Sequence, residues 1–142
     1  MKVGKKALAV LALTMVFSLI FTTIAFAASS YWDFGMNRRV CDGAANGQWH
    51  SLDKGSAHVS GAHQIAGGGS GSQTATLTYY IRRQTSFLGT YKTLATKSYT
   101  VGSSASNLYI SFTADATSSS YYIRVEKDLD YWDASGSGTI AN

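Results

Sequence analysis

The segment TATLTYYIR, residues 74–82, alternates between two kinds of side chain and decides the fold class. One face would carry Ala75, Leu77, Tyr79 and Ile81, and the other would carry Thr76, Thr78, Tyr80 and Arg82. A period of two residues is the pattern of a half-buried β-strand, because successive strand residues point to opposite faces of a sheet. Residues 108–113 and 121–126 repeat this alternation and predict two further strands.

Six other segments carry weaker strand patterns, each bounded by clusters of Gly, Ser or Asn. They are residues 38–41, 48–53, 58–66, 87–94, 96–101 and 138–141. A chain rich in Ser, Thr, Gly and Tyr and without Pro suits exposed strand faces and turns rather than helices. The sequence therefore predicts an all-β fold, an antiparallel β-sandwich with about seven to nine short strands.

One local pattern narrows the architecture. Asp115, the polar residues 116–120 and the pair Tyr121-Tyr122 precede the apolar alternation of residues 123–125. This arrangement resembles the corner before the penultimate strand of immunoglobulin-like sandwiches, where a Tyr hydroxyl bonds back to the chain. The resemblance implies an immunoglobulin-like sandwich. It implies no function, because the Cys pair and the intervening Trp of true immunoglobulin domains are absent.

The start of the chain has the three parts of an export signal. They are the positive region Lys2, Lys5 and Lys6, the apolar run 7–26, and the small-x-small cleavage pattern Ala25-Phe26-Ala27. We expect a signal peptide over residues 1–27 and a single secreted domain over residues 28–142, located outside the cell. The long apolar run and the absence of disulfides favour a bacterial source. An uncleaved membrane anchor is the alternative, since about 20 apolar residues span a bilayer.

Charge argues against a nucleic-acid partner. Residues 28–142 keep nine of the twelve Lys and Arg and all eight acidic residues, which leaves a net charge of +1. The dibasic pairs Arg38-Arg39 and Arg82-Arg83 each offer one outward charge rather than a patch, because neighbouring strand residues face opposite ways. Glycine-rich phosphate loops, HExxH and GxSxG are absent from the sequence.

Cys41 is the only cysteine, so the domain has no internal disulfide. With His50, His58 or His63 it could form a nucleophile and base, as in Cys–His hydrolases. Nothing around Cys41 indicates the helix N-terminus that usually activates such a thiolate. The sequence favours an inert thiol or one that joins two chains, and it predicts no enzyme activity.

Two groups of residues resemble metal ligands without the matching spacing. His58 and His63 are five residues apart and would face opposite sides of a continuous strand, so the three histidines do not predict a zinc or copper site. Glu126, Asp128, Asp130 and Asp133 form an acidic run that lacks the glycine and closing acidic residue of a calcium loop. We expect no metal and no cofactor.

A repeated tripeptide is the most unusual feature. Tyr31-Trp32-Asp33 recurs as Tyr131-Trp132-Asp133, and the two copies use two of the three Trp residues. Because the ends of a domain often lie close together, both copies could sit at one end of the sandwich. Aromatic faces beside carboxylates suit a sugar surface, so the six residues are the candidate ligand-binding site. The alternative is that the two copies pack the ends of the chain together.

These observations favour a secreted, non-enzymatic binding protein whose partner is an extracellular or cell-wall polysaccharide. A secreted antagonist of bacteriocin-like or inhibitory type, acting on a protein target, is one alternative. A self-assembling extracellular subunit is another, because strands without Pro leave edges open to pairing. A Cys–His hydrolase built on Cys41 and His50 is the remaining alternative.

Overall fold

The computed structural model describes residues 29–66, 73–128 and 132–142. The expected signal peptide, residues 1–27, lies outside the described residues. Among the residues that are described, no helix has the length and apolar character needed to cross a membrane.

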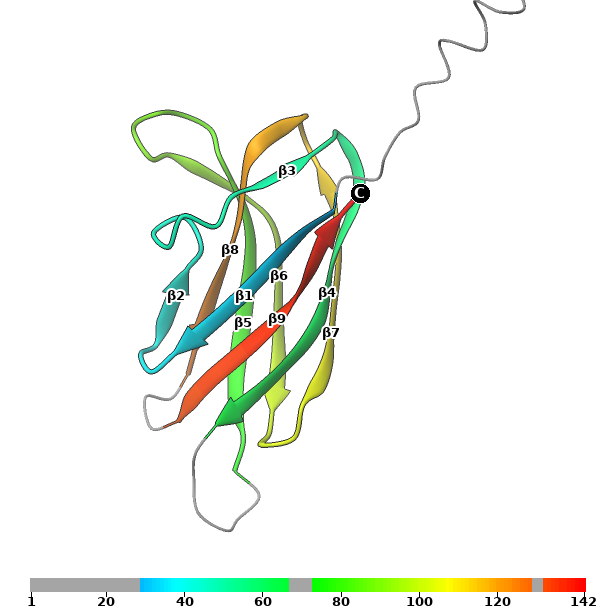
Figure 1. Ribbon diagram of the computed structural model, residues 1–142. Helices are drawn as coiled ribbons and strands as arrows, with labels where there is room; N and C mark the ends of the chain where they lie inside the picture. The colour runs from blue at the N-terminus through cyan, green and yellow to red at the C-terminus, as the bar shows by residue number, and fades with distance from the viewer. Residues whose placement is uncertain (1–28, 67–72, 129–131) are drawn as a thin grey trace, which may run out of the picture.

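Nine strands form two antiparallel sheets over this part of the chain (Figure 1). The strands are β1 Ser29–Met36, β2 Val40–Asp42, β3 His50–Leu52, β4 Gly55–Ala66, β5 Ala75–Gln84, β6 Tyr91–Val101, β7 Ser106–Ala114, β8 Ser118–Lys127 and β9 Asp133–Ala141. The first sheet has the order β1-β9-β4-β7, and the second has the order β2-β8-β5-β6 with β3 also paired to β8. The predicted antiparallel sandwich is confirmed.

The strand order gives the sandwich its particular form. The first strand pairs with the last, from Ser29 opposite Ala141 to Met36 opposite Ala134. In immunoglobulin domains the first strand lies beside the second instead. The order found here is that of a jelly roll, in which two Greek keys interlock across the two sheets. It refines the immunoglobulin-like expectation without changing the sandwich.

Inward-facing side chains of both sheets form one core between them. The alternation predicted for the three strongest strands is confirmed by burial of Ala75, Leu77, Tyr79, Ile81, Leu108, Ile110, Phe112, Tyr121, Ile123 and Val125. The two weaker segments 87–94 and 96–101 form the single strand β6, which begins at Tyr91. Residues 87–90 belong to the loop between β5 and β6.

β1 lies outside the predicted strands although its residues alternate. Trp32, Phe34 and Met36 are buried, and the Trp32 ring stacks 6.1 Å from the ring of Phe34. Gly138 lies opposite Trp32 on β9, and a Cβ atom there would come within 1.9 Å of the Ser60 carbonyl oxygen on β4. Glycine therefore permits a close approach of β9 and β4 behind the indole.

The predicted tyrosine corner is present between β7 and β8. The Tyr121 hydroxyl donates to the carbonyl oxygen of Ala116, and it accepts from the Ala116 N–H at 3.2 Å. Asp115, at the start of the corner, accepts two hydrogen bonds from Arg83, at 2.7 and 3.0 Å. The corner thus ties the β7–β8 turn to β5.

Candidate functional site

A hollow of about 550 Å³ lies on the outer face of the second sheet. Its floor comes from β8, β5 and β6, and its walls come from the loop after β2 and the loop between β5 and β6. Both loops project from the same side of the sandwich, at the upper left of Figure 1. We call this hollow the β8–β5–β6 cleft. Its lining includes Asp42, Arg82, Tyr91, Tyr122, Arg124 and Glu126.

Strand register brings these side chains together. In one row across the sheet, Arg124 of β8 lies between Asp42 of β2 and Tyr80 of β5. In the next row, Tyr122 of β8 lies beside Arg82 of β5. Both rows face outward, because the alternate residues of β8 fill the core. Rows two residues apart are about 7 Å apart along a strand, so one ligand can contact both.

A β-bulge sets the position of the third strand. Ile81 pairs with Ala95, but the next residue, Arg82, pairs with Thr93, so Leu94 is an extra residue in β6. Bulges bend a strand and re-aim the side chains beyond them. Beyond this bulge Tyr91 projects over the cleft, with its ring centroid 4.1 Å from the guanidinium carbon of Arg82.

Local hydrogen bonds hold the first wall against the floor. Oδ1 of Asp42 accepts from the backbone N–H of Ala44 at 3.0 Å, which is the geometry of an Asx turn. Gly43 donates to the Ile123 carbonyl at 2.9 Å, and a Cβ atom at Gly43 would lie 2.7 Å from that oxygen. The loop after β2 is therefore fixed directly on β8.

The second wall is a tight turn. Thr85 donates its backbone N–H to the Thr90 carbonyl at 2.8 Å, and the Ser86 and Thr90 hydroxyls lie 2.7 Å apart. Gly89 has a φ of 81°, a conformation that favours glycine, and it lines the cleft. Phe87 and Leu88 stand at the tip of this turn and are almost fully exposed.

The two arginines of the cleft, Arg124 and Arg82, differ in their ion pairs. Arg124 donates to Oδ2 of Asp42 at 3.3 Å and pairs with Oε1 of Glu126 at 2.8 Å. The Tyr80 hydroxyl donates to the other oxygen of Glu126 at 3.1 Å. Arg82 takes part in none of the ion pairs found among the described residues. Arg124 therefore binds both carboxylates of the cleft, and Arg82 binds neither.

Aromatic rings complete the lining. Tyr91 is half exposed, whereas Tyr122 is buried beneath Trp49, whose ring lies 5.4 Å away in an edge-to-face arrangement. Burial raises the pKa of the Tyr122 hydroxyl, and a hydrogen bond from Arg82 acts in the opposite direction. Tyr122 thus stays protonated at neutral pH. The cleft combines aromatic faces with both signs of charge.

The first copy of the repeated tripeptide is divided by the sheet. Trp32 is only 1% exposed and lies in the core, so its ring offers no surface to a ligand in this structure. Inward alternation in β1 is the physical reason, since it sends Trp32 inward and both neighbours outward. Tyr31 is 65% exposed on the first sheet. Asp33 accepts a hydrogen bond from Gln48 at 2.6 Å.

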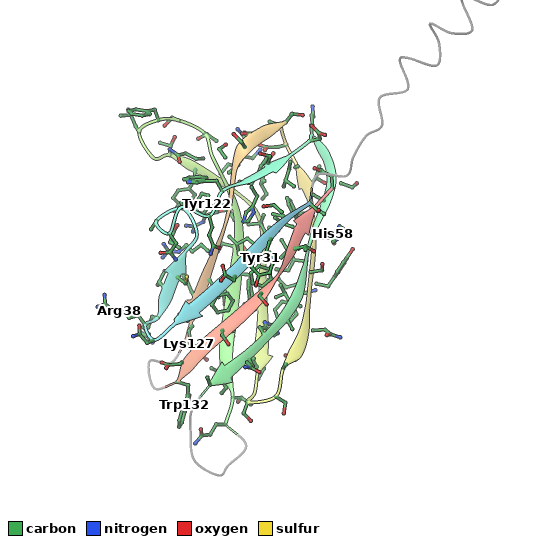
Figure 2. All side chains as sticks on the ribbon, in the orientation of Figure 1. Tyr31, Arg38, His58, Tyr122, Lys127 and Trp132 are labelled. Atoms are coloured by element: carbon green, nitrogen blue, oxygen red, sulfur yellow. The ribbon has the colours of Figure 1, made fainter. Side chains whose placement is uncertain are left out.

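The second copy lies elsewhere. Trp132 is partly buried against the core, and its carbonyl accepts a hydrogen bond from Lys127. Asp133 begins β9 and is exposed, while Tyr131 lies outside the described residues. Register places Trp32 opposite Gly138, six residues beyond Trp132, so the two copies are about 20 Å apart along the sheet. Figure 2 shows Tyr31 and Trp132 well separated. The structure does not bring the two copies together at one end.

A second hollow, of about 380 Å³, lies at the first sheet. Tyr31, Asp33, Gln64, Ser135 and Ser137 line it from the outside. It keeps two of the six predicted site residues together, on the face of the sandwich opposite the β8–β5–β6 cleft. Aromatic contact there is limited to one exposed ring, that of Tyr31, with Phe34 beneath.

Cys41 and the histidines have separate surroundings. Asn46 donates to Sγ of Cys41 at 3.3 Å, and burial raises the pKa of the thiol, which is the opposite of activation. Nδ1 of His50 lies 2.9 Å from the Ser30 hydroxyl, and Nδ1 of His63 lies 2.8 Å from the Tyr79 hydroxyl. His58 instead stacks on Tyr109. The arrangement gives the Cys–His hydrolase interpretation no support.

Metal-ligating side chains are dispersed over the part of the chain that the structure describes. It contains no group of three or more His, Cys, Asp or Glu residues placed to hold an ion. In the acidic run, Asp128 accepts a hydrogen bond from the backbone N–H of Thr76, and Asp130 lies outside the described residues. His58 and His63 face opposite sides of β4, as their spacing predicts.

The residues of the β8–β5–β6 cleft were within reach of the sequence patterns. Alternation over residues 74–82 and 121–126 places Tyr80, Arg82, Tyr122, Arg124 and Glu126 on outward faces. The missing information was that these two strands are neighbours, which the register of β5 with β8 supplies. The sequence did not indicate Tyr91 as a cleft residue, because it predicted a strand over residues 87–94, whereas β6 begins at Tyr91.

Among known proteins, the chain is similar only in fold to the solved structures given below. No family model matches the chain, and no curated protein matches it. Among solved structures, the chain is similar to the CBM22-1 xylan-binding domain of Paenibacillus barcinonensis Xyn10C, with 11% identity, a TM-score of 0.51, and coverage of 82% of this chain and 81% of that one. It is also similar to a structure titled "CBM4 structure and function", with 9% identity, a TM-score of 0.52, and coverage of 85% and 81%. At these identities the likeness establishes a shared β-sandwich architecture.

Proposed function

We propose that this chain is a non-catalytic polysaccharide-binding domain that works outside the cell, and that its ligand lies in the β8–β5–β6 cleft. The observation that carries the proposal is the lining of that cleft. Tyr91 offers an exposed ring to the C–H face of a sugar, and the polar ends of Arg124, Glu126 and Gln84 offer hydrogen bonds to its hydroxyls.

Two further points support this choice of site. Both walls are held by hydrogen bonds, so the cleft is formed before a ligand arrives and ordering it costs little on binding. A domain of similar fold is titled as xylan-binding, which makes xylan the first polymer to test. Secretion rests on the export signal predicted over residues 1–27.

The test is retention of the purified chain on washed cell walls and on insoluble polysaccharides that include xylan. Tyr91→Ala is compared with Tyr31→Ala, because these two exposed tyrosines lie on opposite sheets. We expect Tyr91→Ala to weaken binding about 10-fold or more, as loss of an aromatic anchor does, and Tyr31→Ala to leave it unchanged.

The opposite result would relocate the site. Loss of binding in Tyr31→Ala alone would assign the ligand to the hollow of the first sheet and to the surviving part of the repeated tripeptide. Absence of binding to every polymer and wall preparation, from a chain that unfolds cooperatively, would reject the polysaccharide proposal and favour a protein partner.

A further inference from the structure

Arg82 differs from the other charged residues of the β8–β5–β6 cleft in being buried without an ion-pair partner. Its side chain is buried, with 9% of the residue exposed, and it lines the cleft. Its Nε–H is buried and has no hydrogen-bond partner. Burying a cation is costly unless an anion or several acceptors accompany it. The chain alone therefore leaves this guanidinium incompletely satisfied.

The nearby carboxylates do not fill this role. Asp42 and Glu126 both bind Arg124, and Glu126 also accepts from the Tyr80 hydroxyl. The other ion-pair network on this side joins Asp115 to Arg83 and Lys92. Every carboxylate in these ion pairs is thus engaged by a cation other than Arg82.

The adjacent residue Arg83, in contrast to Arg82, has a carboxylate partner. It binds Asp115 through two nitrogens, and this pairing holds the pKa of Asp115 well below its ordinary value. Arg82 has no such carboxylate: it donates a hydrogen bond to the uncharged Tyr122 hydroxyl, and its guanidinium carbon lies 4.1 Å from the Tyr91 ring centroid and 5.0 Å from that of Tyr80. Rings stabilise a cation partially and do not neutralise it.

We propose that the β8–β5–β6 cleft selects an acidic polysaccharide, and that Arg82 binds the carboxylate of a uronic acid unit in it. This inference rests on the proposed function and names its substrate class. A carboxylate matches the planar fork of a guanidinium, and a charge-assisted contact formed away from bulk water is stronger than a neutral one. Tyr91, beside Arg82, would cover the ring of the same sugar.

The experiment measures affinity for three soluble polymers by affinity electrophoresis at low salt. They are polygalacturonate, the same polymer after chemical reduction of its carboxyl groups, and dextran sulfate. The variants are Arg82→Met, which keeps an apolar stem, Arg82→Lys, which keeps the charge without the planar fork, and Arg38→Met. Arg38 is the matched control, because it is an exposed arginine in the turn between β1 and β2 (Figure 2).

We expect the unaltered chain to bind polygalacturonate about 10-fold or more tightly than the reduced polymer, and more tightly than dextran sulfate. Arg82→Met should abolish this preference, Arg82→Lys should restore only part of it, and Arg38→Met should keep it. Thermal unfolding checks the fold of each variant. Arg82→Met should not lower the melting temperature, because it removes a buried charge that lacks an anion.

Other outcomes separate the two proposals. Equal binding of the native and reduced polymers, or a preference that survives in Arg82→Met, would overturn the role of Arg82 while polysaccharide binding stands. Binding of dextran sulfate as tight as that of polygalacturonate would overturn the assignment to a carboxylate. A folded chain that binds none of the three polymers, nor any in the wider panel, would overturn the proposed function as well. If Arg82→Met fails to fold, the comparison of Arg82→Lys with the unaltered chain decides in its place.

Discussion

On the outer face of the first sheet, β9 presents Ser135, Ser137 and Thr139, and the Ser60 hydroxyl of β4 lies 3.2 Å from that of Thr139. On the outer face of the second sheet, β8 presents Tyr122, Arg124 and Glu126 in the equivalent outward positions. Both faces belong to four-strand paths of the same sandwich. The fold therefore supplies two similar platforms, and the outward residues alone make them chemically different.

Loops increase this difference. The segments after β2 and between β5 and β6 wall the second face, so its charges are partly withdrawn from water. Electrostatic contacts strengthen when water is excluded. The middle of the first face, on β9, has short hydroxyl side chains, and Trp32 points into the core beneath, although Tyr31 and Tyr109 are exposed on β1 and β7. Changes beneath the first face should therefore affect stability, whereas changes in the cleft should affect binding.

The largest expected effect comes from Trp32→Ala. Removing a fully buried Trp leaves a cavity beside Phe34 and Tyr79, and such truncations cost about 3–5 kcal/mol. Trp132→Ala is the control, because that residue is only partly buried and should cost less. Urea unfolding measures both. A Trp32→Ala variant of nearly native stability that has lost ligand binding would contradict the core assignment.

The same residue shows how far the sequence predicts the fold. Periods of two identified β5, β7 and β8 and their buried faces, because alternation needs only local information. β1 has the same alternation of Trp32, Phe34 and Met36, but its repeated tripeptide suggested a surface role. Pairing of β1 with β9 depends on contacts between residues 98 to 112 positions apart, from Met36 with Ala134 to Ser29 with Ala141, and no local pattern encodes them.

The candidate cleft is difficult to predict from the sequence for a related reason. The outward residues of β5 and β8 follow from their sequences, but Arg82 and Tyr122 become neighbours only through strand order. The bulge at Leu94, which directs Tyr91 toward Arg82, has no signal in the sequence such as a glycine. The repeated tripeptide is easily noticed in the sequence, whereas the cleft residues form no sequence motif and come together only in the folded chain.

Acid should weaken the core between the two faces. Burial lowers the pKa of both His50 and His63 below the ordinary value of 6.5, so the folded chain holds them neutral while the unfolded chain binds protons. Stability is therefore complete above pH 6.5 and declines as the pH falls below it. Each histidine contributes at most about 1.4 kcal/mol per pH unit.

Urea unfolding between pH 8 and pH 5 measures this decline. His63→Gln should reduce the slope, since it removes one of the two buried groups. A chain whose stability does not change over this range would show that neither histidine is held neutral by burial.

The smallest expected effect concerns the edge where the two sheets meet. The Tyr99 hydroxyl of β6 donates to the Tyr109 carbonyl at 2.5 Å and accepts from the Tyr109 N–H at 3.2 Å. It thereby covers backbone groups of β7, which is an edge strand of the first sheet. Tyr99→Phe should cost about 0.5–1.5 kcal/mol for these lost hydrogen bonds and leave polymer binding intact.

Uncovering that edge also tests self-assembly, because unpaired strand edges template pairing between chains. Sedimentation over a range of concentrations should show more association for Tyr99→Phe than for Tyr91→Phe, which removes a hydroxyl from the same strand at the cleft. Equal sedimentation of the two variants would mean that the Tyr99 hydroxyl does not protect the edge. Strong association of the unaltered chain would instead favour an assembling subunit, with β7 already open to a partner. The two sheets would then differ in a second respect. The second sheet, which carries the cleft, would also supply Tyr99, the side chain that controls pairing at the β7 edge of the first sheet.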